Sequence, residues 1–190
     1  MKNAIVLYSL IVLISTSVNA QQNRAIPSEK PKLIVEIVVS QMRFDYITRY
    51  WDKFSDGGFK LLVNEGANCK NARYNYLLTQ PYPGIATIST GTNPSMHGII
   101  SDKWYSRTNG QEVLAVSDEK VSTVGGSFFS GKVSAKNLVT STLGDELILN
   151  NPKSKVIGIS LDAGSAILLT GHNASGVYWV DQEKGTFVTS

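Results

Sequence analysis

Two short apolar segments constrain the fold of this chain more than any other feature of its sequence. They are Leu33–Val39 (LIVEIVV) and Lys155–Leu161 (KVIGISL). Both are rich in Val and Ile and lack the alternation of a half-exposed strand, which is typical of strands buried on both faces, as in parallel sheets. Helical patterns lie between the two segments. This alternation predicts an α/β fold with a parallel sheet core flanked by helices.

The segments outside these two runs predict helices, one further strand and the places where they end. Apolar residues at helical spacing favour helices over residues 41–50, 57–66, 85–89 and 135–149. Gly66 suits the left-handed cap that ends the second of these helices, and Ser134 suits the N-cap of the last. A weakly alternating strand is predicted over residues 72–78, and Pro81 ends it.

Two antiparallel pairings are also predicted. Strands over residues 102–107 and 112–116 flank Thr108-Asn109-Gly110, and Asn-Gly is a strong hairpin signal. Residues 177–180 and 186–189 pair in the same way across a short turn, and the stretch over 120–132, rich in Ser and Gly, is a loop. The fold class is therefore an α/β core with an inserted antiparallel hairpin, in a domain that is incomplete.

The N-terminal residues predict export. Met1-Lys2-Asn3 is a short positive region, and an apolar run extends from it to Ile14. Val18-Asn19-Ala20 then places small residues where a signal peptidase reads them, so we expect cleavage before Gln21. The predicted organisation is a signal peptide over 1–20, a flexible leader over 21–32, and the N-terminal part of a domain over 33–190.

Charge and compartment limit the partners of the mature chain. The full sequence has 18 Lys and Arg against 15 Asp and Glu, a formal net charge of +3. Removing Lys2 with the signal peptide lowers it by one to +2, which gives no reason to expect nucleic acid. We predict a periplasmic or secreted protein with no stable membrane anchor after cleavage.

A series of motifs in a fixed order resembles a known family. The motifs are Ile37-Val-Val-Ser-Gln-Met-Arg-Phe-Asp-Tyr46, Gly57-Gly-Phe-Lys60, Ser89-Thr-Gly91, Pro94-Ser-Met-His-Gly-Ile99, Asp102-Lys-Trp-Tyr105, Ile159-Ser-Leu161 and Gly171-His172. Together they resemble the N-terminal portion of the alkaline phosphatase superfamily. Within it, they are similar to the exported phosphate-monoester hydrolases related to type I phosphodiesterases and nucleotide pyrophosphatases. The resemblance implies an alkaline-phosphatase-like fold.

The resemblance also implies a zinc-dependent hydrolase site whose key positions are replaced in this chain. The family's Asp metal ligand at the end of the first strand falls on Ser40, and its Thr or Ser nucleophile falls on Pro81. The Asn that helps to hold the phosphoryl oxygens falls on Asp102. The Lys and Arg of the phosphate clamp fall on Asp162 and Gly164. The resemblance therefore transfers no catalytic, cofactor-binding or metal residue, and no zinc is predicted for this chain.

Other residues near these positions have simpler interpretations. Thr79 lies two residues before Pro81, which on a strand is a displacement of about 7 Å. An error of about 1 Å can already cost about a hundredfold in rate, so Thr79 is interpreted as an ordinary strand hydroxyl. His97 and His172 fall in family motifs that are structural, and both are interpreted as scaffold histidines.

Two functional hypotheses follow. The first is a truncated, exported member of the phosphoester hydrolase lineage that is catalytically impaired or inactive and has a binding role, an accessory role or none; a phosphoester ligand is not expected. The second is an active metal-dependent phosphatase or phosphodiesterase, with a rebuilt site or completed by a separate downstream segment. Because half of a doubly wound sheet exposes a strand edge and an apolar face, self-association is also expected.

Overall fold

The structure is a computed structural model that describes residues 31–127 and 130–190. The predicted signal peptide lies outside the described residues, as does the predicted leader up to residue 30. The chain divides into two compact units, Met1–Ile37 and Val38–Ser190, and the second carries all the helices and strands described below. Within the described ranges, no helix has the length and apolar character needed to cross a membrane.

The first apolar run does not form the predicted buried strand. Residues 33–39 are extended but pair with no strand in the part of the chain that the structure describes. Leu33 and Ile37 are 78% and 80% exposed. A strand exists through hydrogen bonds to a neighbouring strand, so an apolar pattern alone does not create one. The strand predicted over residues 72–78 is wrong for the same reason, because that stretch forms bends without a ladder partner.

Three short helical elements follow. They are α2 (Asp45–Arg49), the 3-10 helix η2 (Trp51–Lys53) and α3 (Phe59–Glu65). The predicted helix over 41–50 is thus shorter than expected, whereas the one over 57–66 is confirmed. The left-handed cap predicted at Gly66 is wrong, since its φ is −98°.

Helices α4 (Pro81–Thr90) and α5 (Pro94–His97) both begin at a proline. Proline suits the first helical position because its φ is already helical and the N–H that it lacks would have no partner inside the helix. Pro81 therefore starts a helix instead of ending a strand, and α4 begins four residues before the predicted start. Both helices end at a glycine in the left-handed conformation, Gly91 and Gly98.

The predicted hairpin is confirmed, but the helix after it starts later than predicted. Strands β1 (Lys103–Ser106) and β2 (Gln111–Leu114) pair antiparallel. The helix expected from residue 135 is α6 (Leu143–Asn150), whose N-cap is Thr142 and not Ser134. Thr142 and Asp145 form a reciprocal capping box, which satisfies more of the helix's free N–H groups than a lone serine does.

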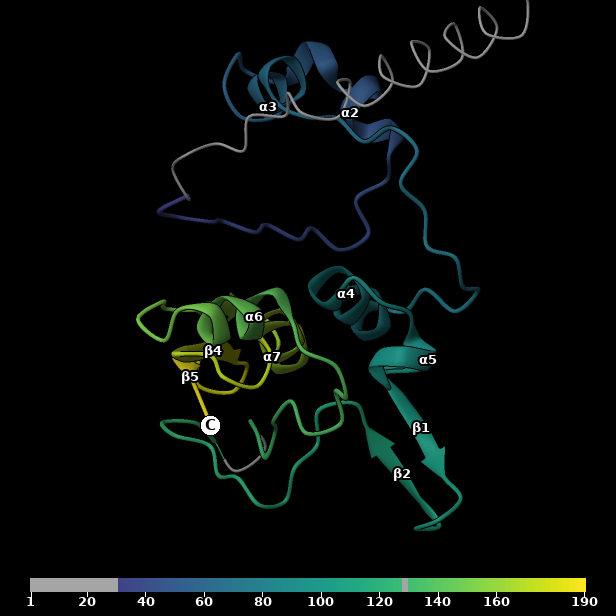
Figure 1. The fold of residues 1–190 in the computed structure, drawn as a ribbon, viewed down its shortest axis with the longest axis vertical. Coiled ribbons are helices and arrows are strands. Elements are labelled where there is room, and N and C mark those ends of the chain that lie inside the picture. Colours follow the sequence, from purple (N-terminus) through teal and green to yellow (C-terminus); the bar gives the residue numbers. More distant parts are fainter. Residues whose placement is uncertain (1–30, 128–129) are drawn as a thin grey trace, which may run out of the picture. The chain divides into compact units, whose positions relative to one another are not determined.

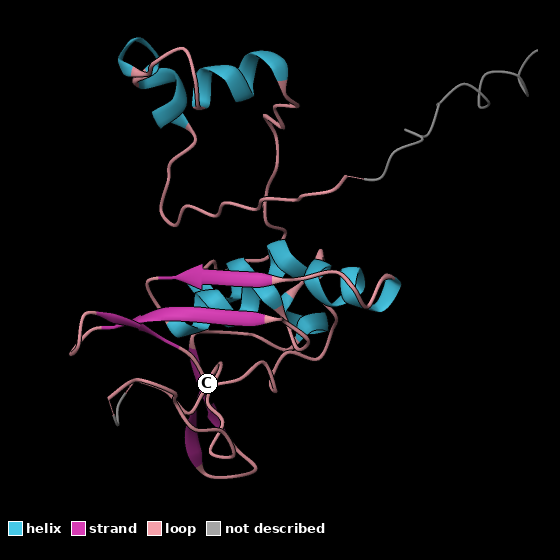
Figure 2. Ribbon diagram, turned by 90° about the vertical axis from the view of Figure 1, so that its left-hand side faces the viewer, coloured by secondary structure: helices cyan, strands magenta, loops and turns pink. Residues whose placement is uncertain are grey.

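The second apolar run forms a strand in a small mixed sheet, but the prediction that it is buried on both faces is wrong, since Ile157 and Ile159 are 61% and 66% exposed. Strand β3 (Ile157–Ser160) pairs parallel to β4 (Gly176–Asp181), and β4 pairs antiparallel to β5 (Thr186–Val188). The parallel part of the sheet is thus one pair of strands, less than predicted. Helix α7 (Ala163–Thr170) connects β3 to β4 and packs against both of them (Figures 1 and 2).

The hydrophobic core lies where α4 and α7 pack against each other and where α7 meets the sheet. Its members include Ile85 and Ala86 of α4, Ile167 and Leu168 of α7, and Trp179 of β4. This packing places the first turns of α4 and α7 near each other, and those two turns carry most of the positions singled out from the sequence.

Candidate functional site

Four of the five positions that the family resemblance marks as replaced meet at the first turns of α4 and α7. Pro81 is the first residue of α4, and Asp162 and Gly164 are the N-cap and second residue of α7. Asp102 reaches the same place from the segment before β1. Tyr82 joins the group: its backbone N–H donates to Asp102 Oδ1 at 2.9 Å, and its ring lies against Gly164.

Reciprocal hydrogen bonds fix the N-terminus of α4. The side-chain Oε1 of Gln80, the N-cap residue, accepts from the Ser101 hydroxyl at 2.6 Å and from the Asp102 N–H at 2.9 Å. The Asp102 carboxylate in turn accepts from the Tyr82 N–H. The free N–H groups of a helix's first turn form a natural anion site. Here the chain's own carboxylate already occupies one of them.

The N-terminus of α7 is closed in a similar way. The Asp162 side chain accepts from the Ser165 N–H at 3.0 Å. The half-buried Tyr82 side chain lies beside it, and burial, followed by the negative charges of Asp162 and Asp102, raises the pKa of the Tyr82 phenol well above its ordinary value. A Cβ on Gly164 would overlap Cζ of that ring and would lie 2.6 Å from its hydroxyl oxygen. Position 164 therefore has no room for a side chain while Tyr82 stays in place.

The fifth position, Ser40, shares a pocket of about 370 Å³ with Pro81. Residues 38–42, Tyr74 and the start of α4 form its walls. Zinc in proteins is held by thiolate, imidazole or carboxylate groups, and none of these lines the pocket. Across residues 31–127 and 130–190, no cluster of three or more His, Cys, Asp or Glu could hold a metal ion. The residues of this site do not fit the zinc that the family resemblance implies.

Thr79 lies in the same pocket, but not on a strand as predicted. It is exposed in an irregular segment, so the 7 Å displacement expected from strand geometry does not describe its position. Sequence reasoning missed Gln80 and Tyr82, which organise the site. The sequence carries no signal for the role of Tyr82, because only the packing of α4 on α7 brings it against Gly164.

Both histidines are bonded to the scaffold. His97 is fully buried, and its Nδ1 accepts from the Ile99 N–H at 3.1 Å, which leaves Nε2 to donate to Thr87 Oγ1 at 3.1 Å. Burial lowers the pKa of His97. His172 has Nδ1 3.0 Å from Asp145 Oδ2 and Nε2 2.9 Å from the Leu138 carbonyl oxygen.

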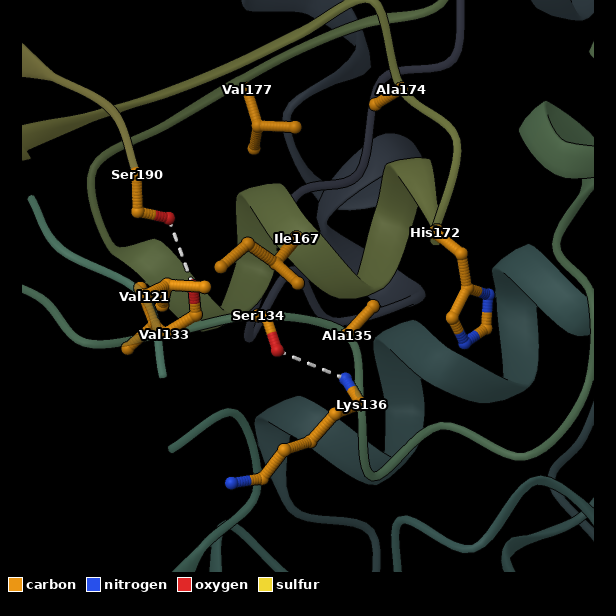
Figure 3. Close-up of a pocket in the computed structure, with 11 residues that line it drawn as sticks. Val121, Val133, Ser134, Ala135, Lys136, Ile167, His172, Ala174, Val177 and Ser190 are labelled. Carbon is orange, nitrogen blue, oxygen red and sulfur yellow. Dashed lines mark hydrogen bonds between the residues drawn. The ribbon is translucent and has the colours of Figure 1, made fainter. Parts of the chain in front are cut away.

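A second pocket, of about 360 Å³, lies between Ile167 of α7, His172 and the segment over 133–136 (Figure 3). Its polar groups are already engaged: the Lys136 N–H donates to Ser134 Oγ at 3.2 Å, and the Lys136 ammonium lies 3.4 Å from Asp118. None of the five replaced positions lines this pocket.

Comparisons with known proteins agree with the resemblance read from the motifs. The model of the family described as type I phosphodiesterase / nucleotide pyrophosphatase matches residues 34–189. Alkaline phosphatase PhoV of Synechococcus elongatus is 41% identical, with 100% of this chain and 36% of the relative covered. Alkaline phosphatase PafA of Elizabethkingia meningoseptica is 41% identical, with 95% of this chain and 33% of the relative covered. The chain thus spans about a third of the length of these curated relatives.

The fold is alkaline-phosphatase-like. The crystal structure of wild-type alkaline phosphatase PafA matches with a TM-score of 0.83 at 42% identity, over 85% of this chain and 31% of that one. The matched part consists here of small mixed sheets with helices, which corresponds to part of a domain.

Proposed function

We infer that this chain, which belongs to the type I phosphodiesterase / nucleotide pyrophosphatase family, is an exported member of the phosphoester hydrolase lineage that does not catalyse hydrolysis. One observation carries the proposal. The positions assigned to the nucleophile and the phosphate-holding groups meet at the first turns of α4 and α7, and they are Pro81, Asp102, Asp162 and Gly164. None of them supplies a nucleophilic hydroxyl or a positive charge.

Electrostatics supports the loss of phosphoester binding. Asp102 and Asp162 stand where the family has a neutral amide and a cation. A phosphoryl oxygen about 4 Å from either carboxylate would be repelled by about 4 kcal/mol at an effective dielectric constant of about 20. The replacement thus removes attraction and adds repulsion at the same point, and Pro81 offers neither a nucleophile nor an N–H donor.

Metal chemistry is expected to be absent as well. Ser40 offers a neutral hydroxyl where the resemblance implies a carboxylate ligand, and the pocket that it shares with Pro81 has no other zinc-binding group. A phosphoester hydrolase of this kind needs the metal to polarise the phosphoryl group and stabilise the attacking oxygen. We therefore assign no catalytic step to this chain.

The test is the release of p-nitrophenol from p-nitrophenyl phosphate and from the bis ester, with the mature chain and added zinc. We expect release no faster than from zinc and buffer alone. Zinc-dependent turnover that is lost in Thr79→Ala would overturn the proposal and favour a rebuilt site, because Thr79 lines the pocket with Pro81. Thr108→Ala, on the exposed hairpin turn, is the matched control.

We also propose that the chain associates with itself or with a complementing segment of the family's domain. Ile159, Tyr178 and Phe187 lie on one face of the β3–β4–β5 sheet and are 66%, 41% and 61% exposed. The outer edge of β3 pairs with no strand in the described ranges. Exposed apolar faces and free edges promote association. A monomer in gel filtration that unfolds cooperatively would contradict this proposal.

A further inference from the structure

We propose that Tyr82 closes the former phosphate site, so that the chain's own groups occupy the space and the hydrogen-bond donors that a phosphoryl group would use. This inference deepens the proposed function and rests on its assignment of positions 102, 162 and 164. It goes further in one respect. Loss of the family's groups accounts for the proposed loss of catalysis, whereas closure by Tyr82 means that restoring the groups at positions 102 and 162 would not by itself reopen the site.

The first part of the argument is steric. The Tyr82 ring lies over the backbone of Gly164, and a Cβ at that position would overlap Cζ and lie 2.5 Å from Cε1. Gly164 itself is buried, and α7 continues through Ala163 and Ser165 without a break. Because the ring is fixed on the side of α4, any side chain at position 164, including an arginine, has to displace it.

The second part concerns hydrogen bonds. An anion at these helix ends would need backbone N–H groups. The Tyr82 N–H is bonded to Asp102 at 2.9 Å, and the Ser165 N–H is bonded to Asp162 at 3.0 Å. Gln80 holds Asp102 in this position through the Asp102 N–H. Two carboxylates thus act as internal substitutes for a bound anion, with the Tyr82 ring between them.

The third part concerns stability, because Tyr82 and Gly164 affect the folding equilibrium together. Tyr82 packs on the core next to residues of both helices, so the ring contributes to folding as well as filling space. Glycine at position 164 is otherwise less favourable than alanine, because Gly lowers the folding equilibrium constant by up to about fivefold relative to Ala in a helix interior and by less in the first turn, where Gly164 lies. Its presence is explained by the ring above it. Tyr82 and Gly164 are therefore expected to depend on each other.

A double-mutant cycle measured by urea unfolding tests this dependence. In the wild-type background, Gly164→Ala should lower the folding equilibrium constant, because the new methyl group meets the ring. In a Tyr82→Ala background, the same change should raise that constant, because only the helix propensity remains. We expect a coupling of about tenfold. Gly57→Ala is the matched control, since nothing lies within 4 Å of a Cβ there, and it should show no coupling to Tyr82.

Hydroxyl-radical footprinting keeps the test decisive if a variant folds poorly. The Tyr82 ring should be protected in the wild-type chain and modified faster in Gly164→Ala, while Tyr105, already exposed on β1, should be unchanged. An effect of Gly164→Ala that is the same with and without Tyr82, together with unchanged protection of Tyr82, would overturn the proposal.

A binding experiment separates closure from simple loss of groups. The variant Asp102→Asn/Asp162→Lys restores two of the groups that the resemblance implies and keeps Gly164 beneath the Tyr82 ring, and its melting temperature is measured with and without inorganic phosphate. We expect no shift while Tyr82 is present and a rise in melting temperature when Tyr82→Ala is added. Equal shifts in the two backgrounds, including none in either, would overturn the closure by Tyr82. The proposed function would still stand, because it depends on the hydrolysis assay of the unaltered chain.

Discussion

Aspartates close the N-termini of α6 and α4 in two different ways. At α6, Asp145 and Thr142 cap the helix locally, and the Asp145 carboxylate also accepts from the backbone N–H groups of His172 and Asn173 at 2.8 and 2.9 Å. At α4, Asp102 comes from 20 residues further along the chain and accepts from the Tyr82 N–H. The first carboxylate joins several segments of the scaffold, whereas the second lies at a position that the family resemblance assigns to the phosphate site.

The surroundings of the two carboxylates explain this difference. Asp145 is 2% exposed, and Thr142, His172 and Asn173 surround it with donors. Burial by itself would raise the pKa of Asp145, but these hydrogen bonds outweigh it and lower the pKa to about 2. Asp102 is only half-buried. The chain thus surrounds Asp145 much more completely than Asp102.

The largest expected effect is therefore at Asp145. Asp145→Ala would leave the buried N–H of Thr142 and the part-buried N–H groups of His172 and Asn173 without their acceptor, and we expect a loss of about 3–5 kcal/mol in the free energy of unfolding. Chemical denaturation measures it. Asp56→Ala, whose carboxylate is fully exposed, is the control and should change stability by less than about 0.5 kcal/mol. A loss for Asp145→Ala as small as that of the control would show that Asp145 does not hold the scaffold together, and the contrast with Asp102 would not stand.

Acid should reveal the same carboxylate without any substitution. The folded-state pKa of Asp145 is lowered from 3.8 to about 2, so its ionised form contributes stability above the unfolded value and that contribution disappears as the pH falls through the folded value. We expect about 2 kcal/mol to be lost between about pH 4 and pH 2. The free energy of unfolding is measured against pH for the wild-type chain and for Asp145→Asn, and the difference between the two curves isolates this contribution. Identical profiles for the two proteins would show that Asp145 does not provide it.

A smaller effect is expected at α4. Asp102→Ala removes the acceptor for the Tyr82 N–H, and the loss of a helix cap costs about 1 kcal/mol. Asp102→Asn keeps an acceptor oxygen and should lose less. Thermal unfolding of the wild-type chain, Asp102→Asn and Asp102→Ala measures the three stabilities, which should decrease in that order. A loss for Asp102→Ala as large as that for Asp145→Ala would mean that Asp102 is a scaffold residue of the same kind.

Sequence patterns identified the hairpin, α3 and the β4–β5 pair, because each depends on contacts or turns close in the sequence. They also located β3, whose partner β4 lies beyond α7, but not its exposed face. They failed at residues 33–39, where an apolar run has no strand partner among the described residues, and at Ser134, where the stronger Thr142–Asp145 capping box lies further on. That box was readable as Thr followed three residues later by Asp.

The candidate site likewise has features that the sequence indicated and features that only the structure reveals. The motifs singled out five positions by resemblance, and the structure brings four of them together, namely Pro81, Asp102, Asp162 and Gly164. The role of Tyr82 was not predictable, because its contact with Gly164 joins residues far apart in sequence and depends on how α4 packs against α7.

The central claim is that this chain retains the family's scaffold without its metal-dependent chemistry. The most direct test is the zinc content of the mature chain, purified from cells grown with added zinc and measured by inductively coupled plasma mass spectrometry. We predict far less than one zinc ion per chain, as for the same chain with Ser40→Ala. A near-integral zinc content that falls in Ser40→Ala would contradict the claim and place a working metal site beside Pro81.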